Sequence, residues 1–120
     1  MAWEIEVTDQ FREWFESQPE ELQNDIAAKV KLLEQHGPHL GRPHAETLSK
    51  QSQYPNMKEL RIQHAGDAYR VLFAFDPRRV AVLLMGDRKP DDGWYKHAVP
   101  RADKLYEALL NELKEEGELD

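Results

Sequence analysis

The stretch MKELRIQHAGDAYRVLFAFDPRRVAVLLM, residues 57–85, decides the fold of this chain. It contains three runs rich in apolar side chains, each short enough to form a strand: 58–63, 68–75 and 80–85. Two turn sequences separate these runs: His64-Ala65-Gly66-Asp67 and Asp76-Pro77-Arg78-Arg79. The stretch therefore predicts three consecutive antiparallel strands joined by tight turns.

A symmetric turn closed over two residues fixes which residues face each other across a hairpin. Closure over Ala65-Gly66 places Arg61 directly opposite Arg70. Closure over Pro77-Arg78 places Phe73 opposite Val82 and ends the third strand at Met85, beside Arg70. This register predicts one uniformly apolar face, which would receive the helices, and an opposite polar face with a small apolar patch: Leu72, Leu83 and Met85.

The segments on either side of these strands predict one more strand and three helices. Residues 3–7 alternate apolar and acidic side chains, which is typical of a half-buried strand. A short helix follows, and a second helix begins near Pro19 and ends where a polar loop, 37–56, begins. A last helix begins at Pro100. The order βααβββα predicts an α+β fold: an antiparallel sheet with a helical hairpin on one face and a C-terminal helix.

The charge of the chain is unevenly distributed. The formal net charge is −7, but residues 57–101 carry 9 Lys and Arg side chains against 6 Asp and Glu. A local basic surface can bind phosphate even where the net charge opposes encounter with nucleic acid. The chain has 120 residues and no cysteine, and we expect one cytoplasmic domain, 1–120, because the sequence shows neither a signal-peptide pattern nor an apolar run long enough to span a bilayer.

The segment MGDRKPDDGWYKHAV, residues 85–99, gathers polar donors beyond the end of the third predicted strand: Arg88, Lys89, Tyr95, Lys96 and His97. Cationic groups around a phosphodiester, with proton carriers beside them, are what RNA cleavage without a metal requires. These residue types therefore favour a site that binds and cleaves RNA.

The pair Arg61 and Arg70 has two interpretations. Like charges opposite each other in a sheet are destabilising unless a neighbour neutralises them, and Glu59 is a diagonal neighbour that could do so. In the other interpretation the two guanidiniums bind a phosphate, which suits their fork geometry.

A metal site is not predicted, because the three histidines of residues 36–44 lie in a Pro/Gly loop without helical spacing.

Four sequence features together resemble the RelE/ParE toxin superfamily, and most closely its phage-derived HigB-like branch: MKELR, YRVLFAFD, VAVLLMGDRKP and WYKHAVPRAD. The resemblance implies the toxin of a type II toxin–antitoxin system. It implies cleavage of mRNA in the ribosomal A site with no metal or other cofactor, and a helix-turn-helix, HigA-like antitoxin as the partner. In the ParE branch the same fold poisons DNA gyrase without catalysis, and an inactive relative would bind only its antitoxin.

The resemblance also implies roles for particular residues. The expected catalytic residues are Arg70, Arg88, Tyr95 and His97. The expected substrate-binding residues, which contact phosphate or RNA, are Lys58, Arg61, Lys89 and Lys96. Which of them acts as base and which as acid stays open.

Overall fold

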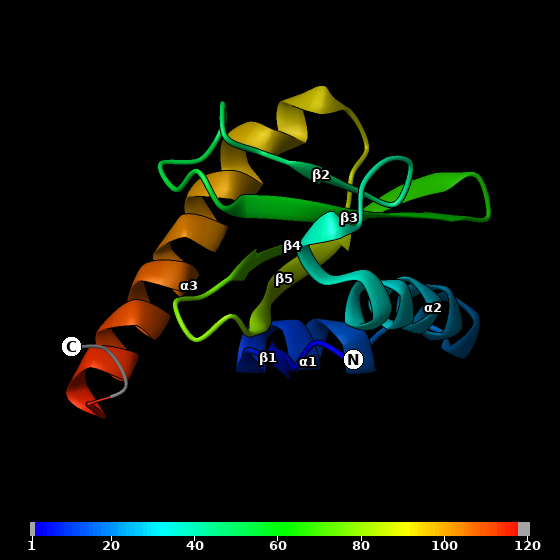
Figure 1. The fold of residues 1–120 in the computed structure, drawn as a ribbon. Coiled ribbons are helices and arrows are strands. Elements are labelled where there is room, and N and C mark those ends of the chain that lie inside the picture. Colours follow the sequence, from blue (N-terminus) through cyan, green and yellow to red (C-terminus); the bar gives the residue numbers. More distant parts are fainter. Residues whose placement is uncertain (1, 118–120) are drawn as a thin grey trace.

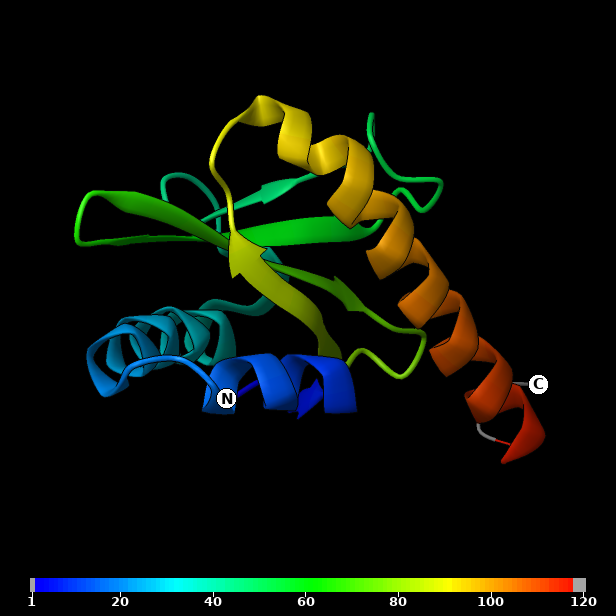
Figure 2. The same ribbon diagram turned by 180° about the vertical axis from the view of Figure 1, so that it is seen from behind.

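A five-stranded sheet lies at the centre of the molecule, with helices against both of its faces (Figures 1 and 2). The computed structural model describes residues 2–117. The elements in chain order are β1 (Ile5–Val7), α1 (Asp9–Glu16), α2 (Glu20–His36), a 3-10 turn (Gly37–His39), β2 (Ala45–Thr47), β3 (Met57–His64), β4 (Asp67–Phe75), β5 (Ala81–Arg88), a second 3-10 turn (Asp92–Trp94) and α3 (Tyr95–Glu115). The α+β class, the helical hairpin and the C-terminal helix are as predicted.

The strand order in the sheet is β1-β5-β4-β3-β2. β1 runs parallel to β5, and all the other neighbours are antiparallel. One face packs against α1 and α2 through side chains such as Phe11 and Ile26, and the other packs against α3 through Ala102 and Tyr106. No helix within residues 2–117 combines the length and the apolar character needed to cross a membrane.

The predicted pairing of β3 with β4 is confirmed. Leu60 lies opposite Val71, and Arg61 lies opposite Arg70. Ala65 and Gly66 both have positive φ, 51° and 83°, as the two central residues of a type I′ hairpin turn require. The two-residue turn therefore sets the register that brings the two arginines together.

The predicted pairing of β4 with β5 is wrong by one residue. The turn holds three residues rather than two, because Asp76 N donates to Val80 O at 2.9 Å and Arg79 adopts a left-handed φ of 68°. Phe73 consequently faces Leu83 instead of Val82. The one-residue shift exchanges the two faces of β5 and moves Leu83 into the core under α1 and α2.

A register shift between Leu72 and Phe73 displaces the rest of the β4–β5 pairing by one further residue. Leu72 then pairs with Met85, and Arg70 pairs with Asp87 rather than with Met85. β5 continues to Arg88, beyond the predicted end of the strand. The predicted apolar patch is therefore divided, with Leu72 and Met85 covered by α3 and Leu83 on the opposite face.

Two element boundaries also differ from the prediction. The polar loop contains β2, which pairs antiparallel with β3 at the edge of the sheet and is too short to be recognised in the sequence. The last helix begins at Tyr95 instead of Pro100, which lies inside it. The Asp91 side chain accepts a 2.8 Å hydrogen bond from Gly93 N and starts the helical path there, so Tyr95 is part of the first turn of α3.

Candidate active site

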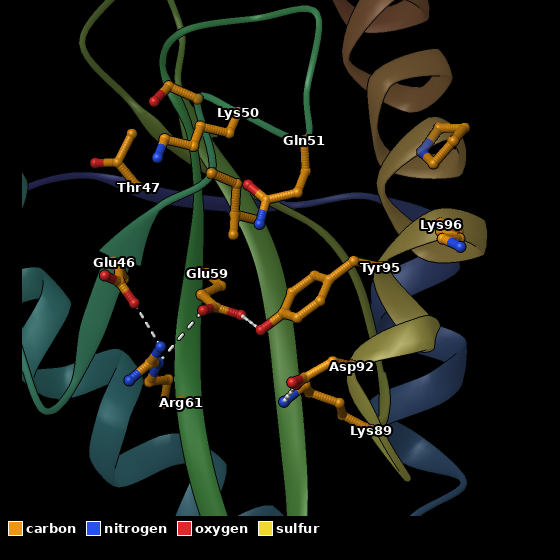
Figure 3. A pocket seen from close by; sticks show the side chains of 13 residues that line it. Glu46, Thr47, Lys50, Gln51, Glu59, Arg61, Lys89, Asp92, Tyr95 and Lys96 are labelled. Carbon is orange, nitrogen blue, oxygen red and sulfur yellow. Dashed lines mark hydrogen bonds and ion pairs between the residues drawn. The ribbon is translucent and has the colours of Figure 1, made fainter.

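A groove of about 830 Å³ opens between the first turns of α3 and the sheet edge formed by β2 and β3 (Figure 3). The loop after β2 closes one end of it, and Lys50 and Gln51 of this loop point toward the groove. Four basic and three acidic side chains line it: Lys50, Arg61, Lys89 and Lys96, with Glu46, Glu59 and Asp92. The groove is therefore a mixed-charge surface in which two of the four cations, Arg61 and Lys89, pair with acidic side chains.

Glu59 lies at the floor of the groove and is only 1% exposed. Its Oε1 atom accepts a 2.7 Å hydrogen bond from the Tyr95 hydroxyl, and its Oε2 atom accepts one of 3.3 Å from Arg61 Nε. Arg70 Nε lies 3.3 Å from Oε1. A buried carboxylate is tolerated only where cations and hydrogen bonds compensate its charge, and here three side chains do so.

The two arginines differ in how they reach the groove. Arg61 lines it, and its Nη2 atom also pairs with Glu46 on the edge strand β2 (Figure 3). The Arg70 side chain is 11% exposed, and its Nη1 atom donates to Tyr69 O at 3.0 Å. Glu59 therefore lies against both arginines, as the first interpretation of this pair expected. Of the two arginines, Arg61 lines the open groove and Arg70 does not.

Tyr95 lies where α3 begins and joins Glu59 to the open part of the groove. Burial, together with the hydrogen bond to Glu59, raises the pKa of Tyr95 to about 12, although Arg70 acts in the opposite direction. The phenol is therefore protonated at neutral pH. Lys89 Nζ lies 5.2 Å from the centre of the Tyr95 ring. The same atom pairs with Asp92 at 2.9 Å, and this contact lowers the pKa of Asp92.

The structure brings five of the eight predicted site residues together. Arg61, Lys89, Tyr95 and Lys96 line the groove, and Arg70 lies beneath it against Glu59. Its observed lining also includes Glu46 and Lys50, which were not predicted to belong to the site. Both come from the loop whose short strand has no sequence signal, so no pattern placed them there.

The other three predicted residues lie outside the groove lining. Lys58 Nζ donates to Thr47 Oγ1 at 3.2 Å on the β2–β3 edge. Arg88 is exposed at the end of β5, with Nε 3.7 Å from Asp67. His97 is exposed on α3. Their roles stay predictions.

The histidine-rich loop is not arranged as a metal site. His44 Nδ1 lies 2.8 Å from Lys29 Nζ, and burial lowers the pKa of Lys29. Within residues 2–117, no cluster of three or more His, Asp or Glu side chains has the arrangement that a metal ion requires.

The fold is that of the RelE toxins. A chain of the RelE–RelB complex from Pyrococcus horikoshii OT3 superimposes with a TM-score of 0.55 at 17% identity, over 75% of this chain and 98% of that chain. A mutant of the Escherichia coli toxin RelE in the free state gives 0.54 at 13% identity, over 84% of this chain and 98% of that chain. At these identities the likeness concerns the fold.

Sequence similarity identifies the family. Residues 13–107 match the family described as phage-derived protein Gp49-like. The proposed toxin HigB3 of Mycobacterium tuberculosis is 40% identical over 84% of this chain and 88% of its own length, and the proposed toxin HigB2 of the same organism is 31% identical over 96% of this chain and 58% of its own length. The chain belongs to the Gp49-like family and is a HigB-like toxin of the type II toxin–antitoxin class.

Proposed function

We propose that this protein is an endoribonuclease that cleaves mRNA on the ribosome without a cofactor and so stops translation. One observation carries the proposal: cations from three parts of the chain, Arg61, Lys89 and Lys96, converge with the Tyr95 hydroxyl on a single groove. Such donors can bind a phosphodiester and stabilise the negative charge that develops on it.

The chemistry proposed for this groove is an internal transfer at phosphorus. The RNA 2′-oxygen gives up its proton to water and bonds to the adjacent phosphorus, and the bond from phosphorus to the 5′-oxygen breaks. That oxygen takes up a proton from water, so no net proton is consumed and the products are a 2′,3′-cyclic phosphate and a 5′-hydroxyl. Arg61, Lys89 and Lys96 stabilise the additional negative charge on the phosphoryl oxygens.

Tyr95 suits a role next to the RNA because it lines the groove beside these cations. Its hydroxyl donates its single proton to Glu59, so the phenol oxygen meets the RNA as a hydrogen-bond acceptor for a ribose hydroxyl. The ring can also stack against a base. The predicted roles of Arg88 and His97 require RNA to extend beyond the groove lining.

The proposal includes a partner and a location. Solved complexes named for RelE and RelB, and for RelBE2 of Mycobacterium tuberculosis, contain toxins of this fold bound to antitoxins. We infer that a helix-turn-helix, HigA-like antitoxin holds this single-domain toxin inactive in the cytoplasm, where ribosomes and mRNA are present.

Expression of the protein without an antitoxin tests the proposed function. We expect growth arrest with rapid loss of mRNA, and relief of both by Arg61→Ala or Tyr95→Phe in variants that remain folded. DNA damage with intact mRNA would instead indicate a gyrase poison. Continued growth with stable mRNA and full antitoxin binding would indicate an inactive relative.

A further inference from the structure

Glu59 occupies a position where a charge is costly. It lies on β3 opposite Leu72, on the sheet face that α3 covers, and its side chain is 1% exposed. An apolar side chain at this place would avoid the loss of hydration that a buried carboxylate suffers. Core packing therefore does not explain why a carboxylate occupies this position.

Two guanidiniums hold the carboxylate in place. Arg61 Nε donates to Oε2 at 3.3 Å, and Arg70 Nε lies 3.3 Å from Oε1. Both arginines come from strands whose register is fixed by a two-residue turn, so the carboxylate has a rigid framework on either side.

The Tyr95 hydroxyl is the third partner, and the Tyr95 side chain lines the groove as Arg61 does (Figure 3). A phenol has a single proton to donate, and Tyr95 gives it to Glu59 across 2.7 Å. This bond fixes the ring against the sheet and directs the lone pairs of the phenol oxygen away from Glu59. The contact joins the first turn of α3 to the middle of β3, between residues 36 positions apart in the sequence.

We propose that Glu59 is a positioning residue that holds the Tyr95 hydroxyl in the orientation in which it meets RNA. The inference rests on the proposed function for its purpose, but the contact itself can be tested without RNA. Glu59 acts through Tyr95, because both of its oxygens are already occupied by protein donors.

The first experiment follows Tyr95 by NMR in tyrosine-labelled protein as the pH is raised from neutral, with Tyr95→Phe to assign its signal. The wild-type pKa is about 12, and Glu59→Gln should lower it because the charge and the acceptor carboxylate are lost. Glu46→Gln is the matched control: it removes a groove carboxylate that pairs with Arg61 but does not contact Tyr95. An unchanged Tyr95 titration in Glu59→Gln overturns the proposal.

A second variant covers the case in which Glu59→Gln does not fold. Glu59→Asp keeps the charge between the arginines but withdraws it by one methylene group, so the Tyr95 bond should be lost while the charge compensation remains. A fall in the pKa of Tyr95 is expected here too, smaller than in Glu59→Gln, because the hydrogen bond is lost but the negative charge remains. A folded Glu59→Asp protein whose Tyr95 titrates as in the wild type contradicts the inference as directly as the Gln variant would.

The second experiment measures cleavage of ribosome-bound mRNA. Glu59→Gln should lower kcat by about a hundredfold with little change in KM, which is the cost of a misplaced group near the reacting atoms. Adding Glu59→Gln to Tyr95→Phe should lower kcat little further, because the group that Glu59 positions is already absent. If the two substitutions lower kcat in the double variant by the product of their separate factors, Glu59 does not act through Tyr95 and the positioning role is refuted.

The two experiments separate the possible failures. If the wild-type protein cleaves RNA but the pKa of Tyr95 is the same in Glu59→Gln as in the wild type, the positioning role alone is refuted. A wild-type protein that never cleaves RNA, with a Tyr95 pKa that responds to Glu59, refutes the proposed function and with it the purpose assigned to Glu59, while the contact stands.

Discussion

Arg61 of β3 and Arg70 of β4 lie directly opposite each other in the sheet, and the Glu59 carboxylate lies 3.3 Å from the Nε atom of each. Directly opposed like charges destabilise a sheet. The buried carboxylate reverses this effect, since it compensates both cations and is compensated by them. The three side chains therefore form one unit, and the loss of a single member should affect the other two.

Arg70→Ala should destabilise the protein by about 3 kcal/mol, because it removes one of two cations beside a buried carboxylate. Urea unfolding monitored by circular dichroism measures the free energy. Arg12→Ala is the matched control: its pair with Asp9 is exposed on both sides, 54% and 87%, and should contribute less than about 0.5 kcal/mol. Equal losses in the two variants would show that the buried unit has no special energetic role.

A second prediction concerns acid stability. The hydrogen bond from Arg78 to Glu6 ties the β4–β5 turn to β1 and lowers the pKa of Glu6 from 4.5. A lowered folded-state pKa contributes stability that is present above the unfolded value and is lost as the pH falls through the folded value. Glu6→Gln should therefore lower stability at neutral pH and make its decline in acid shallower.

Urea midpoints measured at successive pH values, from neutral to below 4.5, test this prediction. Glu13→Gln provides the control, because Glu13 lies on an exposed position of α1. If Glu6→Gln follows the wild-type curve at every pH, the contact between Arg78 and Glu6 does not stabilise the fold.

The β3–β4 hairpin was predictable because two simple rules agree there. Gly66 follows Ala65 between two runs of apolar residues, which indicates a two-residue turn there. A two-residue turn allows only one register between the two strands. The β4–β5 hairpin was not predictable in the same way. Asp76-Pro77-Arg78-Arg79 fits a two-residue and a three-residue turn, and only the left-handed φ of Arg79, which no glycine signals, selects the longer one.

The residues that line the groove were predicted in part: Arg61, Lys89, Tyr95 and Lys96 were expected at the site, whereas Glu46 and Lys50 were not. The opposition of Arg61 and Arg70 follows from the register alone. The arrival of Tyr95 at Glu59 depends on where α3 begins, which Asp91 sets and Pro100 obscures. The cap at Asp91 is a local contact, but the contact between Tyr95 and Glu59 joins residues 36 positions apart, and a sequence pattern does not record such packing.

A third prediction concerns Gly86, which lies on β5 against α1. A Cβ atom at this position would lie 2.3 Å from the Trp14 ring, so Gly86→Ala should cost about 2 kcal/mol through overpacking. Gly41→Ala is the control, because a Cβ atom there meets nothing within 4 Å. Thermal unfolding should separate the two variants, and Trp14→Leu should partly restore Gly86→Ala. A stable Gly86→Ala protein would mean that Trp14 moves freely.

The last prediction concerns the balance of charge in the groove. Asp92 is exposed and pairs with Lys89 at 2.9 Å, so this lysine is neutralised at the place where RNA would bind. Asp92→Asn should release Lys89 for a phosphate contact and strengthen binding of a short RNA. Lys96→Ala should weaken it, because Lys96 lines the same groove. Each phosphate contact changes the slope of log affinity against log salt concentration by roughly one, so the slope should steepen in Asp92→Asn and flatten in Lys96→Ala.

Fluorescence anisotropy with a labelled oligoribonucleotide over a range of salt concentrations provides the measurement. His97→Ala is the informative neighbour, because His97 follows Lys96 on α3 but lies outside the groove lining. If RNA binds only along this groove, the salt slope of His97→Ala should match that of the wild type. A change in His97→Ala as large as that in Lys96→Ala would show that RNA continues past the groove onto the exposed surface of α3.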